Sequence, residues 1–351
     1  MRFVLFLLRC RRIGLGFLAL SCGFGALLTA PAQAEACGAS ANLEPCFDAN
    51  SLWLPAGRAA FMTLPDTRVN APGKLSLGFA TEFLHAPVTF QVSSPDRSGR
   101  TVFVVGDALD SSLFFAAGVP DHLEVTATLP ARLYQHGAGA DAAASQSAPA
   151  IQQAAVRDPR LGVAYSLDDA LNRPGYGLRL GVELSLPLGD ESAAAGERSV
   201  VAVPSVTFGW QHSRVAIRAS AGARLRRSVD FGDTRLGSEA SIALGIGVDV
   251  FDPGLLFLSL EGFALPPLGS SRASTANEAI TSVTWLPVEW FFAARTSFRR
   301  GSEWSLAGSF GTGLPLSSET RSTSTGADSS HFLAVTEPEW RSVLYVRFTP
   351  K

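Results

Sequence analysis

The stretch YGLRLGVELSLPLGD, residues 176–190, alternates between large apolar residues and smaller or charged ones. Leucine or valine occupies every second position over Leu178–Leu188, and Arg179 and Glu183 are among the residues between them. An alternation of period two predicts a β-strand with one apolar and one polar face. Such a strand suits either a soluble sandwich, whose leucines point into a core, or a membrane barrel, whose leucines face lipid.

The same alternation recurs along the chain after Gly73, which predicts an all-β protein. Charged residues fall on the less apolar face of these segments with few exceptions. After the N-terminal region, no run approaches the roughly 18 apolar residues of a membrane-spanning helix. We predict twelve strands, at residues 74–84, 111–120, 122–134, 160–168, 176–188, 200–211, 215–226, 235–250, 254–264, 283–299, 304–313 and 339–349.

The connections between these strands distinguish the two architectures. Short connections such as GVPDH, QHSR and FDPG alternate with long ones such as residues 135–158 and 314–338. A transmembrane barrel has tight periplasmic turns and longer external loops, whereas a Greek-key sandwich requires no such alternation. We therefore predict a transmembrane antiparallel up-and-down β-barrel of about 12 strands over residues 73–351, with the sandwich as the alternative.

Two further features favour an outer-membrane barrel. Trp210, Trp285, Trp304 and Trp340 fall near predicted strand ends, where interfacial aromatic girdles lie. The alternating pattern of Ser342–Phe348 resembles the C-terminal signal that the outer-membrane assembly machinery recognises. We expect outer-membrane lipid and this machinery to be the partners of the barrel.

The first 34 residues predict an export signal peptide. Arginines form a basic leader, an apolar segment follows over residues 13–28, and a small-residue site precedes a cleavage position near Ala34. A retained membrane anchor is the alternative. Cleavage would leave 25 basic and 31 acidic residues, a composition that does not suggest nucleic-acid binding. The predicted location is the cell outer membrane.

Residues 35–72 form a separate N-terminal segment, which we place in the periplasm. It carries Cys37 and Cys46, and an exported protein is expected to join these two cysteines in a disulfide. They form no tight Cys-x-x-Cys pair and no histidine lies near them, so we predict no metal site. The apolar stretch SLWLPAGRAAFMTL predicts that part of the segment enters the periplasmic mouth of the barrel as a partial plug.

The histidines give little support for catalysis. His85, His136 and His331 fall in predicted external loops, and His122 and His212 fall in predicted periplasmic turns. None has an acidic residue at a recognisable motif spacing, and no phosphate-binding loop is present. We predict no enzyme, no catalytic residue and no cofactor, and an outer-membrane hydrolase is a minor alternative.

The polar positions of the predicted strands form the candidate functional set. In a barrel they would line the lumen, where opposite charges either pair and nearly close the channel or line a narrow polar path. The predicted lumen-facing residues are Glu82, Glu124, Arg160, Arg179, Glu183, Arg218, Arg224, Glu239, Asp249, Glu261, Glu289, Arg295, Arg341 and Arg347.

Several segments resemble a known group of barrels. They are RDPRLGVAYSLDD, GYGLRLGVELSLPLGD, VPSVTFGWQHSRVAIRASAGARLRR and EPEWRSVLYVRFTPK. They look like the barrel that precedes periplasmic modules in some OmpA-family proteins, which is similar to the outer-membrane group named for a MetA pathway of phenol degradation. The resemblance covers about residues 48–349. The peptidoglycan-binding domain expected after such a barrel is not found in the residues up to Lys351, so we do not expect cell-wall anchoring.

The sequence therefore predicts a passive channel or transporter for small solutes. The resemblance implies a preference for apolar or aromatic compounds, and the identity of the solute stays open. The alternative is a structural or surface-adhesion barrel whose lumen is sealed by paired charges.

Overall fold

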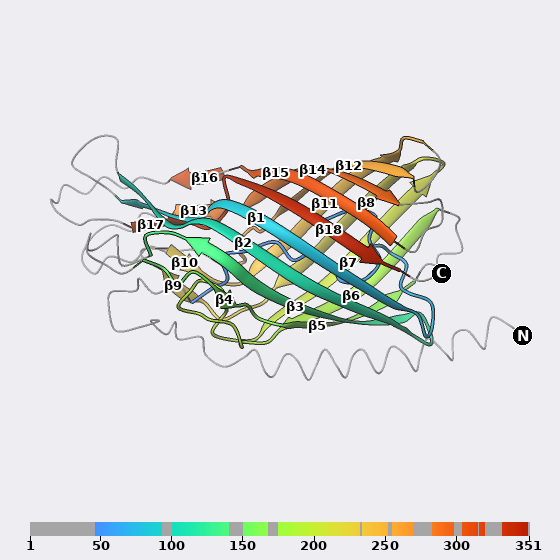
Figure 1. Cartoon of the computed structure of the whole chain (residues 1–351), viewed down its shortest axis with the longest axis horizontal. Coiled ribbons are helices and arrows are strands. Elements are labelled where there is room, and N and C mark those ends of the chain that lie inside the picture. Colours follow the sequence, from blue (N-terminus) through green and yellow to red (C-terminus); the bar gives the residue numbers. More distant parts are fainter. Residues whose placement is uncertain are drawn as a thin grey trace, which may run out of the picture. The chain divides into compact units, whose positions relative to one another are not determined.

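The alternating segments form a closed antiparallel barrel in the computed structural model of the chain. The structure describes residues 46–92, 100–139, 150–167, 175–231, 234–251, 255–269, 283–297, 304–314, 316–319 and 332–349. Twelve strands pair in sequence order, and β1 pairs with both β2 and β18, which closes the sheet (Figure 1). The predicted all-β fold and the strand count are confirmed. The barrel strands are β1 (Leu75–Val92), β2 (Arg100–Val119), β3 (Leu123–His136), β5 (Arg160–Ser166), β6 (Tyr176–Ser185), β7 (Val201–His212), β8 (Val215–Arg224), β11 (Glu239–Asp249), β12 (Leu256–Ala264), β14 (Val288–Ser297), β15 (Trp304–Gly313) and β18 (Trp340–Phe348).

Several predicted boundaries were wrong, including the start of the second strand, which begins at Arg100 and not at residue 111. Most of the predicted loop at residues 84–100 is strand, because the β1–β2 hairpin continues past a register shift at Ala86 and Pro87. Pro287, which has no backbone N–H to donate, separates β14 from a short β13. The segment at residues 234–236 pairs outside the barrel. The short strands are β4 (Ala155–Val156), β9 (Val229–Phe231), β10 (Thr234–Leu236), β13 (Val283–Leu286), β16 (Leu316–Glu319) and β17 (Phe332–Val335).

The two ends of the barrel differ in their connections. Short connections such as residues 120–122 and 213–214 join strands at one end, which we call the turn end. The long connections, including the one that carries β9 and β10, join strands at the other, which we call the loop end. The barrel begins at Leu75 and finishes at Phe348, both at the turn end.

The outward face of the barrel is strongly apolar. Leu244 is 60% exposed and Leu129 is 52% exposed, although both lie in the middle of strands. An apolar surface on this scale is typical of a membrane-facing wall. Other exposed apolar side chains on outward strand positions are Leu77, Phe79, Leu113, Phe115, Val125, Leu161, Val163, Val206, Phe208, Ile242, Ile246, Leu260, Phe292, Phe310 and Leu344.

Aromatic clusters lie at both ends of this wall. At the turn end, the Trp304 ring lies 4.9 Å from the Phe348 ring. At the loop end, Trp340 stacks on Phe83 with ring centroids 5.0 Å apart. The side chain of Trp285 lies outside the described residues. The positions of Trp304 and Trp340 at the two ends of the wall are those expected for interfacial aromatic girdles.

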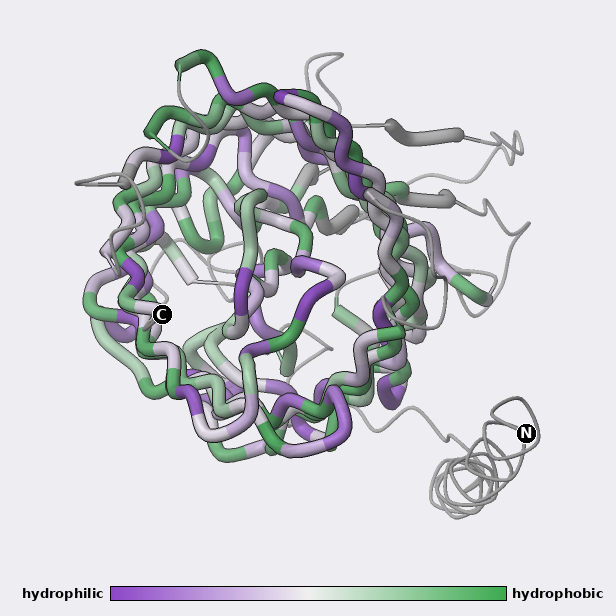
Figure 2. The backbone as a smooth tube through the Cα atoms, turned by 90° about the vertical axis from the view of Figure 1, so that its right-hand side faces the viewer, coloured by the Kyte–Doolittle hydropathy of each residue, from purple (hydrophilic) through white to green (hydrophobic). Residues whose placement is uncertain are grey.

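A non-strand segment, residues 46–72, passes through the lumen, and we call it the inner segment. Figure 2 shows it inside the ring of strands. Asn50 contacts Arg341 near the loop end, and Asn70 contacts Ser76 near the turn end. The inner segment therefore reaches beyond the turn-end mouth to the opposite end of the lumen. Within the described residues no helix is long and apolar enough to cross a membrane.

Two apolar clusters hold the inner segment. The first joins Leu52, Phe61 and Leu64 to the inward faces of β12, β14, β15, β18 and β1. The second lies at the loop end, where Phe231 of β9 packs 4.5 Å from the Phe90 ring and 5.1 Å from the Phe47 ring. These contacts explain why a proline-interrupted segment with few internal hydrogen bonds is ordered.

Candidate functional site in the barrel lumen

Asn50 fixes the inner segment near the loop end. Its buried side-chain amide donates hydrogen bonds to Glu82 at 3.2 Å and to Asp110 at 3.0 Å. Its amide oxygen accepts hydrogen bonds from Arg341 and from the backbone N–H of Leu52. One short polar side chain thereby joins three strands of the wall to the inner segment.

Arg341 pairs with two carboxylates that come from distant parts of the sequence. Its guanidinium donates to both oxygens of Glu289, each at 3.0 Å, and to Glu82 at 3.0 Å. Glu289 also accepts a hydrogen bond from the hydroxyl of Ser51 in the inner segment. Arg341 and Glu289 have no solvent exposure, so this cluster of one guanidinium and two carboxylates is buried away from water.

A second cluster at the loop end contains residues that the sequence reasoning missed. Arg132 donates to Asp110 at 2.7 Å, and Arg157 donates to Asp48 of the inner segment at 2.7 Å. Arg157 also lies 3.1 Å from Asp110. Asp110 and Arg132 lie at the alternate positions of β2 and β3 that face the lumen. The alternating sequence pattern could therefore have identified them.

From the middle of the lumen towards the turn end, the backbone of the inner segment is held by charged side chains. Glu261 accepts hydrogen bonds from the backbone N–H groups of Met62 and Thr63 at 2.9 and 2.8 Å. Arg295 and Arg347 both donate to the carbonyl oxygen of Ala59. The carboxylate and the guanidiniums thus satisfy backbone groups that no strand pairs.

Towards the turn end, two further ion pairs complete the contacts. Arg218 lies 3.2 Å from Asp66, and Arg179 donates to Glu124 at 3.1 Å. Glu124 also accepts from the backbone N–H of Asn70 at 3.0 Å. Ion pairs therefore follow the inner segment along the whole length of the lumen.

The fourteen predicted lumen-facing residues occupy these contacts or lie beside them. Twelve are buried, and Glu183 and Arg295 are half-buried. Glu239 pairs with Arg226 at 2.9 Å, and Asp249 is buried near the turn end. Their burial reflects the inner segment, which fills a lumen that would otherwise hold water.

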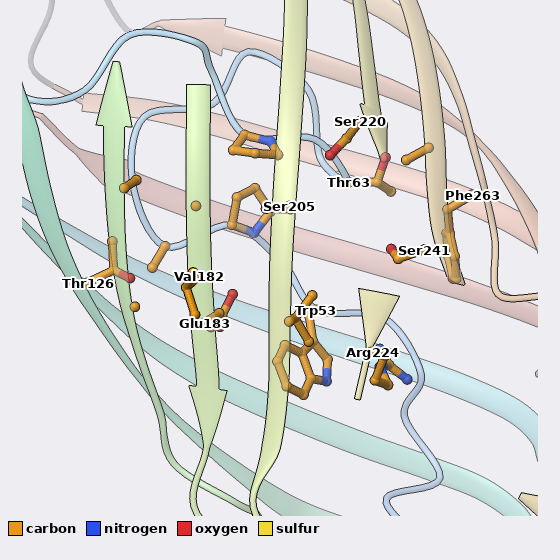
Figure 3. Close-up of a pocket in the computed structure, with 18 of the residues that line it drawn as sticks. Trp53, Thr63, Thr126, Val182, Glu183, Ser205, Ser220, Arg224, Ser241 and Phe263 are labelled. Carbon is orange, nitrogen blue, oxygen red and sulfur yellow. The ribbon is translucent and has the colours of Figure 1, made fainter. Parts of the chain in front are cut away.

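The inner segment leaves one side of the lumen unfilled. A cavity of about 140 Å³ lies between it and strands β3 to β12. Small and hydroxyl-bearing wall residues line the strand side. They include Gly181 and, labelled in Figure 3, Thr126, Ser205, Ser220 and Ser241. On the facing side the lining comes from the inner segment and is largely apolar, with Leu52, Trp53, Pro55, Ala56 and Pro65.

Trp53 lies between charged groups at the edge of this cavity. The guanidinium carbon of Arg160 lies 4.8 Å from the Trp53 ring centroid, and that of Arg224 lies 5.1 Å from it. Both distances fit cation–π contacts. Glu183, Arg179 and Arg224 also line the cavity, so it carries charge of both signs.

His85 has an acidic partner that its sequence position did not reveal. It lies in β1, and its Nδ1 is 2.7 Å from Asp107 of β2. Its Nε2 is 3.8 Å from Glu339, and its ring stacks on Trp340. Both ring nitrogens therefore face carboxylates on the outer wall.

No group of three or more His, Cys, Asp and Glu side chains in the described ranges is arranged to bind a metal ion. Cys46 is disulfide-bonded, and its predicted partner Cys37 lies outside the described residues. His331 also lies outside them.

The sequence matches no protein-family model and no curated protein. Solved structures do resemble the chain. An outer membrane channel from Pseudomonas putida F1 matches with a TM-score of 0.55 at 16% identity, covering 81% of this chain and 98% of that one. This likeness shows a shared barrel fold.

Two other solved structures match at lower TM-scores. The NanC porin gives 0.42 at 7% identity, with 78% of this chain and 98% of that chain covered. The P. putida toluene transporter TodX gives 0.41 at 9% identity, with 80% and 91% covered.

Proposed function

We propose that the chain is an outer-membrane channel for the passive movement of small solutes. The observation that carries this proposal is the cavity between the inner segment and strands β3 to β12. A barrel with a purely structural role has no need of an unfilled, mixed polar and apolar space inside a lumen that is otherwise packed. The wall of small residues is what a narrow path would require.

The proposed orientation places the turn end in the periplasm and the loop end outside, as in other outer-membrane barrels. The signal peptide over residues 1–34, with cleavage near Ala34, would deliver the chain to that membrane. The outer-membrane assembly machinery would read β18, which closes the barrel between β15 and β1. Outer-membrane lipid would cover the apolar wall.

The proposed solutes are small and apolar or aromatic. The apolar lining from the inner segment supports this class, because Trp53 and the prolines offer flat surfaces to a ring. The resemblance to the OmpA-family barrels and to the MetA-pathway group suggests the same preference. The fold shared with the P. putida outer membrane channel is compatible with it.

The alternative is a structural or adhesion barrel with a sealed lumen. The buried pairing of Arg341 with Glu289 and Glu82 favours it, because paired charges close that part of the interior. If the chain is a channel, the solute must pass on the opposite side of the lumen, along the cavity wall formed by strands β5 to β11. The non-enzymatic assignment remains part of the proposal.

Planar-bilayer recording on the purified full chain tests the proposal. We expect discrete conductance steps, and Ser205→Phe, which narrows the cavity, should reduce them. Val206→Phe is the matched control, because Val206 neighbours Ser205 but is 45% exposed on the outer face. A silent wild-type barrel, or equal effects of the two substitutions, would favour the sealed structural barrel.

A further inference from the structure

Two guanidiniums that contact the Trp53 ring are paired with carboxylates more loosely than six other arginines of the barrel are. They belong to Arg224, which lines the cavity, and to Arg160, which is not one of the lining residues. Arg160 lies 3.6 Å from Glu183, and Arg224 lies 3.8 Å from Glu239. Both distances are longer than the donor–acceptor distance of a hydrogen bond. The shortest carboxylate contacts of Arg132, Arg157, Arg179, Arg218, Arg226 and Arg341 are 2.7 to 3.2 Å.

The loose pairing leaves donors unused. The buried Nη1 of Arg160 has no hydrogen-bond partner among the described residues, and neither has the Glu239 oxygen that faces Arg224. Arg224 makes one hydrogen bond to the inner segment, to the carbonyl oxygen of Ser51. A guanidinium carries five N–H donors, so both arginines retain capacity for another acceptor.

These two arginines flank one ring. Trp53 lines the cavity and has Arg160 and Arg224 within cation–π distance. Figure 3 shows Trp53, Glu183 and Arg224 gathered in one part of the cavity, with Thr63, Ser220 and Ser241 in another. The site therefore combines flat apolar surface, hydroxyl groups and under-used positive charge.

The size of the cavity limits what can enter. Its volume of about 140 Å³ is close to that of a cavity of roughly 150 Å³ that holds benzene in another protein. One six-membered ring with a small substituent is therefore the largest solute expected without movement of the inner segment.

We propose that the cavity binds a single-ring aromatic carboxylate, with the ring against the apolar side of the inner segment and the carboxylate on Arg224, which lines the cavity. A carboxylate is the acceptor that a guanidinium binds best, because the hydrogen bonds are charge-assisted and can be bidentate. Glu183 opposes an anion, but its contact with the Arg160 guanidinium is 3.6 Å long and its side chain is 29% exposed, so it has room to turn away. This proposal rests on the proposed channel function and specifies that the solute is negatively charged.

Isothermal titration calorimetry on the detergent-purified full chain tests the site, with benzoate as the probe and benzyl alcohol as its uncharged match. We expect benzoate to bind at least about tenfold more tightly than benzyl alcohol. Arg224→Gln should weaken benzoate binding by about tenfold and leave benzyl alcohol binding within about twofold. Arg198→Gln, in the exposed loop-end connection, is the control and should change neither.

A second pair of variants covers the case in which the Arg224 substitution prevents folding. Ser241→Phe fills the cavity without removing charge and should abolish binding of both probes. Ile242→Phe, on the neighbouring outward position that is 52% exposed, should leave both unchanged. Heat-modifiable migration on gels checks that each variant forms its barrel.

The outcomes separate this inference from the channel proposal. Equal binding of benzoate and benzyl alcohol, or no benzoate binding, overturns the inference even if the barrel conducts ions. Benzoate binding that depends on Arg224 in a barrel that is silent in bilayers supports the site and overturns the channel.

Discussion

The carboxylate of Glu261 accepts two hydrogen bonds from Thr63, one from its backbone N–H and one from its hydroxyl, each at 2.8 Å. The two residues are 198 positions apart in the chain, and one lies on the wall while the other lies on the inner segment. Ser259 donates a further hydrogen bond to the same carboxylate. This relationship shows that the wall holds the inner segment through its backbone as well as its side chains.

Glu261→Ala should therefore loosen the inner segment. It leaves the N–H groups of Met62 and Thr63 buried without an acceptor, and we expect the free energy of unfolding to fall by about 3 kcal/mol. Urea unfolding in lipid vesicles, followed by tryptophan fluorescence, measures the loss. Glu191→Ala, in a half-exposed loop position, is the control. Equal stability of the two variants would contradict the anchoring role.

Arg341→Ala should have a larger effect, because it leaves Glu289 and Glu82 buried without their cation. Removing one partner of a buried ion pair typically costs about 3–5 kcal/mol. The same unfolding assay measures it. The double variant with Glu289→Gln should recover part of the loss, since it also removes one stranded charge. If the double variant loses as much free energy of unfolding as the two single variants together, the two residues act independently.

Gly57→Ala should displace the inner segment near Glu124. A Cβ at this position would lie 2.2 Å from the Glu124 carboxylate oxygen that pairs with Arg179. We expect a loss of about 1–3 kcal/mol from this overpacking. Gly269→Ala, where a Cβ would meet no atom within 4 Å, is the matched control and should unfold as the wild type does.

Glu337 should give the stability a pH dependence. This carboxyl lies between β17 and β18, and its burial raises its pKa to about 8, although the N–H of Val288 donates to it. Because the folded state holds its proton more tightly than the unfolded state, stability should fall as pH rises from the ordinary glutamate range, near 4.5, to about 8. Unfolding midpoints between pH 5 and 9, compared with those of Glu337→Gln, measure the change. A variant that keeps the wild-type pH dependence would rule out Glu337 as its source.

Cys46 should be found joined to Cys37. The structure shows Cys46 in a disulfide, and Cys37 is the other cysteine that remains after the predicted cleavage near Ala34. Mass spectrometry of a non-reduced digest should yield one cross-linked peptide containing both residues, and it should disappear on reduction. A linkage to Cys22 would show that the leader is retained.

Alternation and connection lengths along the chain were together enough to predict the wall of this protein. Each strand points every second residue to the same side, so Leu178–Leu188 and the other apolar sets predict one apolar face per strand without any long-range information. The order of short and long connections then favours an up-and-down membrane barrel over a sandwich, which assigns the apolar faces to lipid. Where the local pattern is interrupted, as at Ala86 and Pro87, the same reasoning ended β1 too early, because the pairing with β2 resumes after a register shift.

The contents of the lumen were decided by tertiary structure. Sequence placed Arg341, Glu289 and Glu82 on inward positions, but the pairing among them depends on barrel closure, which brings β1, β14 and β18 within reach of one another. The path of the inner segment, the stacking of Trp53 and the loose pairing of Arg160 also depend on contacts between residues far apart in sequence. Periodicity is a property of neighbouring residues and determines which way a side chain points. Which side chain it meets is determined by the closed fold.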